Sequence, residues 1–71
     1  MERYKSLRDI RYQNNELSQE EMAKRIGITK SAYCNIERGQ RFGSVKTWLK
    51  IQSLFKLTDA EVWRLIKQSN N

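Results

Sequence analysis

Residues 17–39, LSQEEMAKRIGITKSAYCNIERG, decide how this chain folds. Ser18 with Glu21 three residues later is the pattern of a capping box, in which each side chain bonds the other residue's backbone amide at the start of a helix. Gly27 is typical of the left-handed residue that ends a helix, and Thr29 is typical of the residue that caps the next one. The sequence therefore predicts two helices of about eight residues, joined by a short turn.

The second of these helices, from Lys30 to about Arg38, has two unlike sides. Tyr33 and Ile36 form an apolar inner side, whereas hydrogen-bonding side chains cover the rest. A turn this short makes the two helices cross steeply, so that the second one projects outward. Eight helical residues span about 12 Å, which is comparable to the width of the B-DNA major groove.

Similar signals predict three further helices around this pair. The first runs from about Arg3 to Asn14, and the side chains near it that point inward are Tyr4, Leu7, Ile10 and the apolar plug Leu17. The fourth begins at Ser44, and its inward positions are Val45, Trp48, Ile51 and Phe55, followed by Leu57. The fifth opens with a capping box of Thr58 and Glu61 and carries Val62, Trp63, Leu65 and Ile66. Because no long stretch alternates apolar and polar residues as a strand would, we expect an all-α, compact five-helix domain.

The length of 71 residues allows a single domain, which we place at residues 1–68, with a frayed tail at 69–71. The longest apolar run is short, so no transmembrane segment is expected. The sequence does not begin with a basic segment followed by an apolar stretch, so we expect no signal peptide. We therefore expect a cytoplasmic protein without a membrane partner.

Two features of the composition limit the catalytic and metal-binding chemistry that the chain could carry out. The chain has no histidine, which removes the usual general base and the commonest metal ligand. Cys34 is the single cysteine, so neither an intrachain disulfide nor a cysteine-based zinc site can form. No two carboxylates are evidently arranged as a catalytic pair. We therefore expect no enzyme activity, no metal, no cofactor and no pocket for a small-molecule ligand.

The positive charge is concentrated in one part of the chain. Residues 24–50 hold seven lysines and arginines but a single acidic residue, Glu37, and therefore carry the whole net charge of +6. A localised positive face suits a polyanion, because neutralising phosphates releases counterions. A net charge on a solvated surface also keeps a protein soluble. The charge alone therefore leaves open whether this face binds a polyanion or only contacts water.

The pattern as a whole resembles the Cro/repressor-type helix-turn-helix family, the lambda-repressor-like domains of xenobiotic-response-element type. The similarity covers about Leu7 to Leu57. Counted from Gln19, the alanine at the fifth position and the glycine at the ninth lie where that family has them. The resemblance implies a prokaryotic or phage transcription regulator that binds double-stranded operator DNA, usually as a homodimer.

The same resemblance implies roles for individual residues. Base edges would be contacted by Lys30, Ser31 and Asn35, and the DNA backbone by Gln19, Arg38, Gln40 and Arg41. Arg11 and Glu37 would form a structural ion pair between the first and third helices. The residue chemistry agrees, because lysine suits guanine and asparagine suits adenine. Among the cations, Arg38, Arg41 and Lys46 suit contacts to DNA phosphates. The free backbone amides near Ser44, at the start of the fourth helix, could also bind a phosphate.

Several residues keep two interpretations. Phe42 either packs under the fourth helix or lies against the DNA backbone. Cys34 is either a small filler or a redox switch. Four apolar residues at the edge of the inward stripes suggest a dimer interface, because exposed apolar patches often mark interfaces; they are Leu49, Leu54, Trp63 and Leu65. The alternative is that Trp63 and Leu65 close the core.

We expect a repressor that reads an operator half-site with residues 30–38 in the major groove. Among DNA-binding proteins, the alternatives are an antitoxin that represses its own operon and a controller of restriction-modification genes. A different class is a basic protein-interaction adaptor that does not bind DNA. RNA binding is disfavoured, because apart from Tyr33 and Phe42 no aromatic side chains are interleaved with the basic ones.

Overall fold

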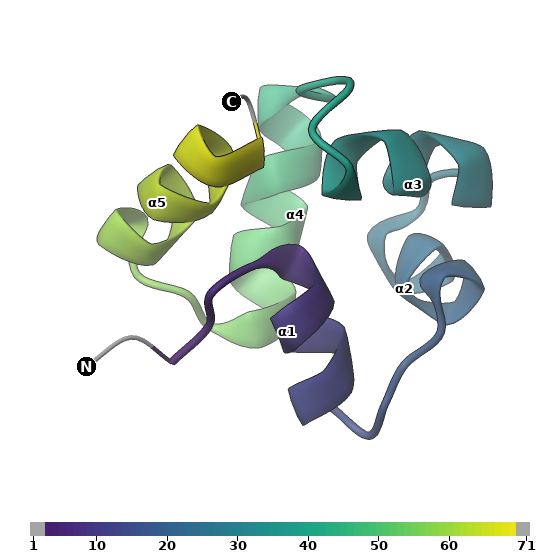
Figure 1. Ribbon diagram of the computed structural model, residues 1–71, viewed down its shortest axis with the longest axis horizontal. Coiled ribbons are helices and arrows are strands. Elements are labelled where there is room, and N and C mark those ends of the chain that lie inside the picture. The colour runs from purple at the N-terminus through teal and green to yellow at the C-terminus, as the bar shows by residue number, and fades with distance from the viewer. Residues whose placement is uncertain (1–2, 70–71) are drawn as a thin grey trace.

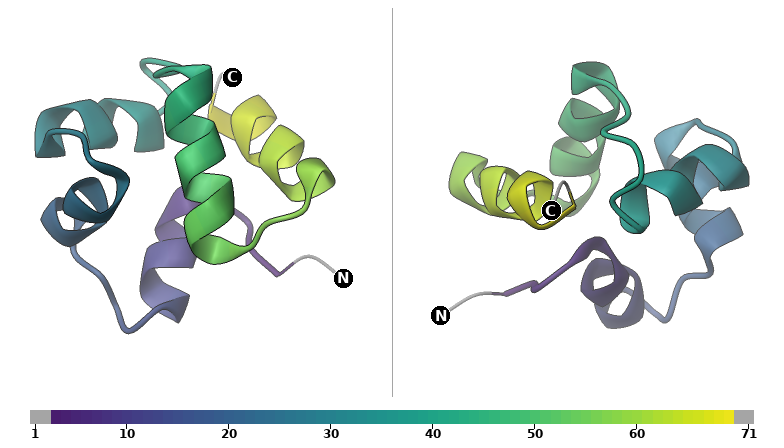
Figure 2. Two further views of the ribbon diagram at one scale, coloured as in Figure 1. Left: turned by 180° about the vertical axis from the view of Figure 1, so that it is seen from behind. Right: turned by 45° about the horizontal axis from the view of Figure 1, so that its top comes forward.

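The computed structural model describes residues 3–69, which form five helices and, within that range, no strand (Figure 1). The helices are α1 (Leu7–Gln13), α2 (Gln19–Ile26), α3 (Lys30–Glu37), α4 (Val45–Phe55) and α5 (Asp59–Ser69). Seen from the front and from behind, α4 lies between α5 on one side and the α2–α3 pair on the other (Figures 1 and 2). The prediction of an all-α fold with five helices is confirmed.

The predicted helix caps are present. The Ser18 hydroxyl accepts the Glu21 backbone N–H at 3.1 Å, and the Glu21 carboxylate accepts the Ser18 N–H at 3.0 Å. Thr58 and Glu61 form the same reciprocal pair at the start of α5, at 3.1 and 2.8 Å. The Thr29 hydroxyl caps α3 through a single bond. Because all these bonds join residues three apart, the local sequence determines where these helices begin.

The predicted start of the first helix is wrong. α1 begins at Leu7 and not at Arg3, because the Ser6 hydroxyl accepts the Asp9 backbone N–H at 3.2 Å and caps the helix there. Residues 3–5 are not helical. Their side chains and carbonyls are therefore free to bond other parts of the domain.

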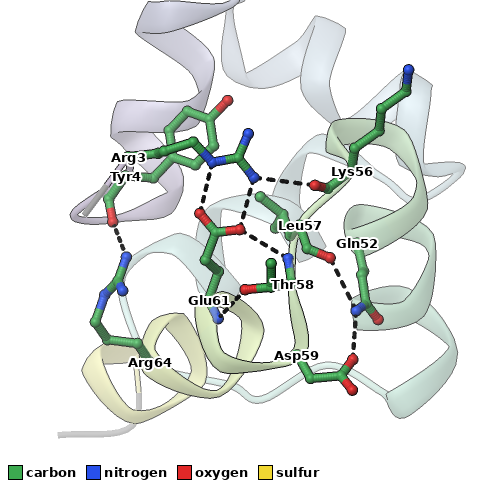
Figure 3. A network of polar contacts seen from close by, with 9 residues as sticks. All are labelled: Arg3, Tyr4, Gln52, Lys56, Leu57, Thr58, Asp59, Glu61 and Arg64. Atoms are coloured by element: carbon green, nitrogen blue, oxygen red, sulfur yellow. Dashed lines mark hydrogen bonds and ion pairs between the residues drawn. The ribbon is translucent and has the colours of Figure 1, made fainter. Parts of the chain in front are cut away.

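Arg3 and Tyr4 are held against the junction of α4 and α5 (Figure 3). Arg3 donates to both carboxylate oxygens of Glu61, at 2.9 and 2.7 Å, and to the backbone oxygen of Lys56 at 3.1 Å. Arg64 of α5 donates to the backbone oxygen of Tyr4. Arg3 and Glu61 are 58 residues apart in sequence, so these contacts join the start of the described chain to the first half of α5 and to the residue that ends α4.

The core is formed by one face of every helix. Its buried apolar side chains are Leu7, Ile10, Leu17, Met22, Ala23, Ile26, Tyr33, Ile36, Trp48, Ile51, Leu57 and Leu65. Partly buried side chains that pack against them are Tyr4, Ile28, Phe55, Val62 and Ile66. The predicted inward residues of the first and third helices and the apolar plug after the first one are confirmed.

Two apolar positions differ from the prediction. Val45 was expected to point inward but is 66% exposed. It is the first residue of α4, and the first buried residue of that helix is Trp48, three residues later. Leu65, assigned to a dimer interface, is 1% exposed and belongs to the core, three residues after the half-buried Val62 on the inward face of α5. Trp63 points away from that face and is 64% exposed, so the alternative that Trp63 closes the core is wrong.

The last described residue is helical. α5 includes Ser69, the first residue of the expected frayed tail, and Asn70 and Asn71 lie outside the described residues. Within the described range, no helix has the length and apolar character needed to cross a membrane.

Two glycines with positive φ provide a matched test of the turns. Gly27 (φ +89°) has nothing within 4 Å of the place a Cβ would take, whereas a Cβ on Gly43 (φ +87°) would lie 2.8 Å from Cδ1 of the buried Ile36. We expect Gly27→Ala to lower the free energy of unfolding by about 1 kcal/mol through backbone strain alone. Gly43→Ala should lower it by about 2 kcal/mol, because overpacking adds to the same strain. Urea unfolding of the two variants measures the difference, and equal losses would contradict the close approach at Gly43.

Candidate nucleic-acid interface

α2 and α3 form the predicted helix-turn-helix. Gly27 ends α2 in the left-handed conformation, and the backbone N–H groups of Gly27 and Ile28 both donate to the Ala23 carbonyl, at 2.8 and 3.0 Å. α3 begins three residues after Gly27, and its buried side chains Tyr33 and Ile36 belong to the core. α3 therefore lies at the outside of the domain, and no other helix covers its remaining sides (Figure 2).

The outer side of α3 carries the three residues predicted to contact bases. Lys30 and Ser31 are exposed in its first turn, and Asn35 is half-buried one turn later. Residues four apart in a helix lie one above the other, so Ser31 and Asn35 share a face. Lys30 is five residues before Asn35 and lies about 140° around α3 from it, so it adjoins this face from the first turn.

The loop after α3 returns to this surface. The backbone N–H groups of Gln40 and Arg41 both donate to the Asn35 carbonyl, at 2.9 and 3.3 Å. These bonds hold the loop against the last turn of α3, beside Arg38. The side chains of Arg38, Gln40 and Arg41 are all exposed there, so the predicted backbone-contacting residues lie next to the predicted base-contacting ones.

Phe42 and the first turn of α4 follow this loop. The Phe42 ring lies 6.3 Å from that of Trp48, whose indole N–H donates to the Phe42 carbonyl at 2.8 Å. Packing of Phe42 against α4 is therefore confirmed, although the side chain stays 37% exposed. The Ser44 hydroxyl accepts the Thr47 N–H at 3.1 Å as the cap of α4. A phosphate at this turn would therefore be received by backbone amides beside the exposed Lys46.

The predicted ion pair between Arg11 and Glu37 is present and largely buried. Arg11 Nε and Nη2 each donate to a different carboxylate oxygen of Glu37 at 2.9 Å, and Nη1 donates to the Leu17 carbonyl at 3.0 Å. The two side chains are only 9% and 11% exposed. Burial acts to raise the pKa of Glu37, but the hydrogen bonds and the positive charge of Arg11 outweigh it and hold that pKa below its ordinary value. The pair therefore stays ionised at neutral pH and joins α1 to the end of α3.

Gln19 is oriented by this ion pair. Its Nε2 donates to Glu37 Oε1 at 3.3 Å from the first residue of α2. A predicted phosphate contact from Gln19 would thus come from a side chain that is already held in place. Tyr33 is also coupled electrostatically to Arg11 and Glu37, and burial raises the pKa of its phenol, which stays protonated. Its hydroxyl is buried without a hydrogen-bond partner among the described residues.

A model of the helix-turn-helix family matches residues 7–62. The chain belongs to the Cro/repressor-type helix-turn-helix family. This is a family of DNA-binding transcription regulators and not of enzymes. Searches of curated proteins and of solved structures returned no match.

For a helix-turn-helix protein, the charge around α3 is the decisive electrostatic property. Glu37 is the single acidic residue of residues 24–50, and it is paired with Arg11 from outside that segment. In the described part of the chain the ion pairs are Arg3–Glu61 and Arg11–Glu37. The positive charges of Lys24 and Arg25 act on Glu21 of the same helix. The cations from Lys30 to Lys50 form no ion pair within the described chain, so they are free to attract phosphates.

The remaining candidates from the sequence are the single cysteine and a metal site. Cys34 is a free, half-buried cysteine of α3. No cluster of three or more His, Cys, Asp or Glu side chains between residues 3 and 67 could hold a metal ion.

Exposed apolar side chains gather on α4 and α5. Leu49, Leu54 and Trp63 of the predicted dimer interface are 58%, 38% and 64% exposed. Sequence reasoning missed Val45, which it assigned to the core, although its spacing of four from Leu49 puts both on one side of α4. Leu54 lies about 140° around the helix from Leu49, so it does not share that side.

Proposed function

We propose that this protein is a repressor that binds a specific operator in double-stranded DNA. The observation that carries the proposal is the part of α3 that no helix covers. It presents Ser31 and Asn35 on one face and Lys30 in the first turn, beside exposed cations that form no ion pair among the described residues. An α-helix of this length fits the major groove. Occupying a promoter needs nothing beyond this surface, which makes repression in the cytoplasm of a prokaryotic cell the simplest mechanism.

Some of these residues would contact base edges, and others would contact the DNA backbone. Lys30 would contact guanine, Asn35 would contact adenine, and Ser31 would contact either base. Phosphates would be bound by Gln19, Arg38, Gln40, Arg41, Lys46 and the backbone amides near Ser44, which hold the protein in register without reading the sequence.

We further propose that the repressor acts as a homodimer. Val45 and Leu49 form an apolar stripe on α4, and Trp63 is the most exposed large apolar side chain of α5. Apolar side chains at the surface are covered when two copies meet. A two-fold dimer would place its recognition helices about 34 Å apart, one turn of DNA, and would read a near-palindromic site.

Selection of binding sites from a random duplex DNA pool at physiological salt tests this function. An enriched near-palindrome would support a dimeric repressor and give its half-site spacing. A short motif without symmetry would support a monomeric reader. If nothing is enriched and no binding weakens with salt, the repressor is excluded and a protein-interaction adaptor becomes the better interpretation.

Asn35→Ala and Arg41→Ala should have different effects on DNA binding. Loss of a base contact should cost Asn35→Ala about 1–3 kcal/mol at one base position and relax specificity there. Loss of a phosphate contact should weaken Arg41→Ala equally on all sequences and reduce the salt dependence by about one ion. Fluorescence anisotropy on the selected site and on single-base variants measures both quantities. A uniform loss for Asn35→Ala would remove it from the base-reading residues.

A further inference from the structure

An open groove lies between α1 and the helix-turn-helix. It has a volume of about 790 Å³. Arg8 and Tyr12 of α1 line one wall, and Gln19, Lys30 and Arg38 of α2, α3 and its cap line the other. The groove therefore opens beside Lys30, the first residue of α3 and one of the residues proposed to read bases.

The charges of the groove favour an anion. Four cationic and two acidic side chains line it. Arg11 and Glu37 are paired with each other at 2.9 Å, which leaves three cations against Glu20 alone. Arg8, the cation contributed by α1, has no acidic partner among the described residues.

Arg8 and Tyr12 are arranged before any ligand binds. Arg8 Nε and Nη2 donate to the Tyr12 hydroxyl at 3.3 and 3.1 Å, and the guanidinium carbon lies 5.3 Å from the ring centroid. The guanidinium carbon of Arg11 lies 5.4 Å from the same ring. The Tyr12 oxygen accepts these bonds, so its own hydrogen is left to donate, as is Nη1 of Arg8. Tyr12 is 49% exposed, which makes both groups accessible from the groove.

We propose that this groove binds a backbone phosphate of the DNA strand beside α3, with Arg8 and Tyr12 as the ligands contributed by α1. The inference rests on the proposed DNA binding and extends the contact surface to a helix that the sequence pattern did not implicate. A DNA phosphate is favoured over a small free anion because the opposite wall contains Lys30, which begins the recognition helix. A strand that passes α3 would therefore run along the mouth of the groove.

The test compares Arg8→Gln with Arg25→Gln, two variants that each lose one positive charge. Arg25 lies five residues beyond Glu20, about 140° around α2 from the groove, and does not line it. Binding to the selected site and to a mixed-sequence duplex is measured between about 50 and 200 mM salt. Arg8→Gln should reduce the salt slope by about one on both DNAs and keep their affinity ratio, whereas Arg25→Gln should keep the wild-type slope.

Two conservative variants separate charge from hydrogen bonding. Arg8→Lys should keep the wild-type slope, because it keeps the charge. Tyr12→Phe keeps the ring and the charge, so it should weaken binding about three- to tenfold with an unchanged slope. Circular dichroism verifies that each variant folds. If Arg8→Gln does not fold, the side-chain Nε resonance of Arg8 in the wild-type protein is followed instead, and it should shift when duplex DNA is added.

The outcomes distinguish this inference from the proposed function. Salt-sensitive wild-type binding with an unchanged slope in Arg8→Gln would overturn the phosphate site and leave the repressor in place. An Arg8 resonance that does not move on DNA binding would overturn it as well. Wild-type protein that shows no salt-sensitive binding to either duplex would overturn the repressor itself.

Discussion

Arg11→Ala should lower the free energy of unfolding by about 3 kcal/mol, near the low end of the range for breaking a buried ion pair. The substitution leaves the Glu37 carboxylate and the Leu17 carbonyl without the donors that they have at 2.9 and 3.0 Å. A chain of 71 residues has a total stability of about 4–10 kcal/mol. The loss is therefore a large share of the total, and urea unfolding at neutral pH measures it directly.

The second ion pair of the domain provides the control. Arg3 and Glu61 approach more closely, at 2.7 Å, but the Arg3 side chain is 51% exposed. Water screens such a pair and the mobile side chains lose entropy on pairing, so Arg3→Ala should shift the urea midpoint far less than Arg11→Ala. Equal shifts would show that burial of the Arg11–Glu37 pair is not what makes it important.

The Arg11–Glu37 pair also makes stability depend on acid pH. The pKa of Glu37 is lower in the folded protein than its ordinary value, so the pair contributes fully above the unfolded pKa of about 4.3. The contribution is lost as the pH falls below that value and through the folded pKa. The difference in unfolding free energy between wild type and Glu37→Gln should therefore shrink between about pH 7 and pH 3. Hydrogen bonds from Arg3 lower the pKa of Glu61 to about 2, but that effect is common to both proteins and cancels.

Leu65→Ala should also lower the free energy of unfolding by about 3 kcal/mol, within the range found for removing a buried leucine side chain. Leu65 is 1% exposed and lies among the largest fully buried side chains. Its substitution leaves a cavity between α5 and the rest of the core. Thermal and urea unfolding, followed by circular dichroism, measure the loss.

Trp63→Ala is the matched variant two residues earlier. Because Trp63 is 64% exposed, its loss should change stability by no more than about 0.5 kcal/mol. If two copies meet through α4 and α5, Trp63→Ala should instead weaken self-association, which sedimentation equilibrium measures. A Trp63→Ala protein that unfolds as easily as Leu65→Ala would contradict the exposure of Trp63, and one that dimerises like wild type would remove Trp63 from the interface.

Local spacing was sufficient to predict four of the five helix starts. Ser18, Thr29, Ser44 and Thr58 each cap a helix by accepting the backbone N–H of the residue three positions later. The start of α1 was mispredicted, because Tyr4 has the spacing of the inward stripe but lies before the cap. The Arg11–Glu37 pair was predicted only through the family resemblance, since no local pattern links residues 26 positions apart.

By itself, the sequence determined the all-α fold, the helix-turn-helix and the positive segment at residues 24–50, because caps, turns and charge are properties of neighbouring residues. The tertiary structure decided which apolar residues of α4 and α5 are covered. Val45, Trp63 and Leu65 are all apolar, and only the packing of other helices against one side of each helix separates buried from exposed. It also decided that α1 forms a basic groove with α2 and α3, because the charges that line this groove come together only when the three helices pack.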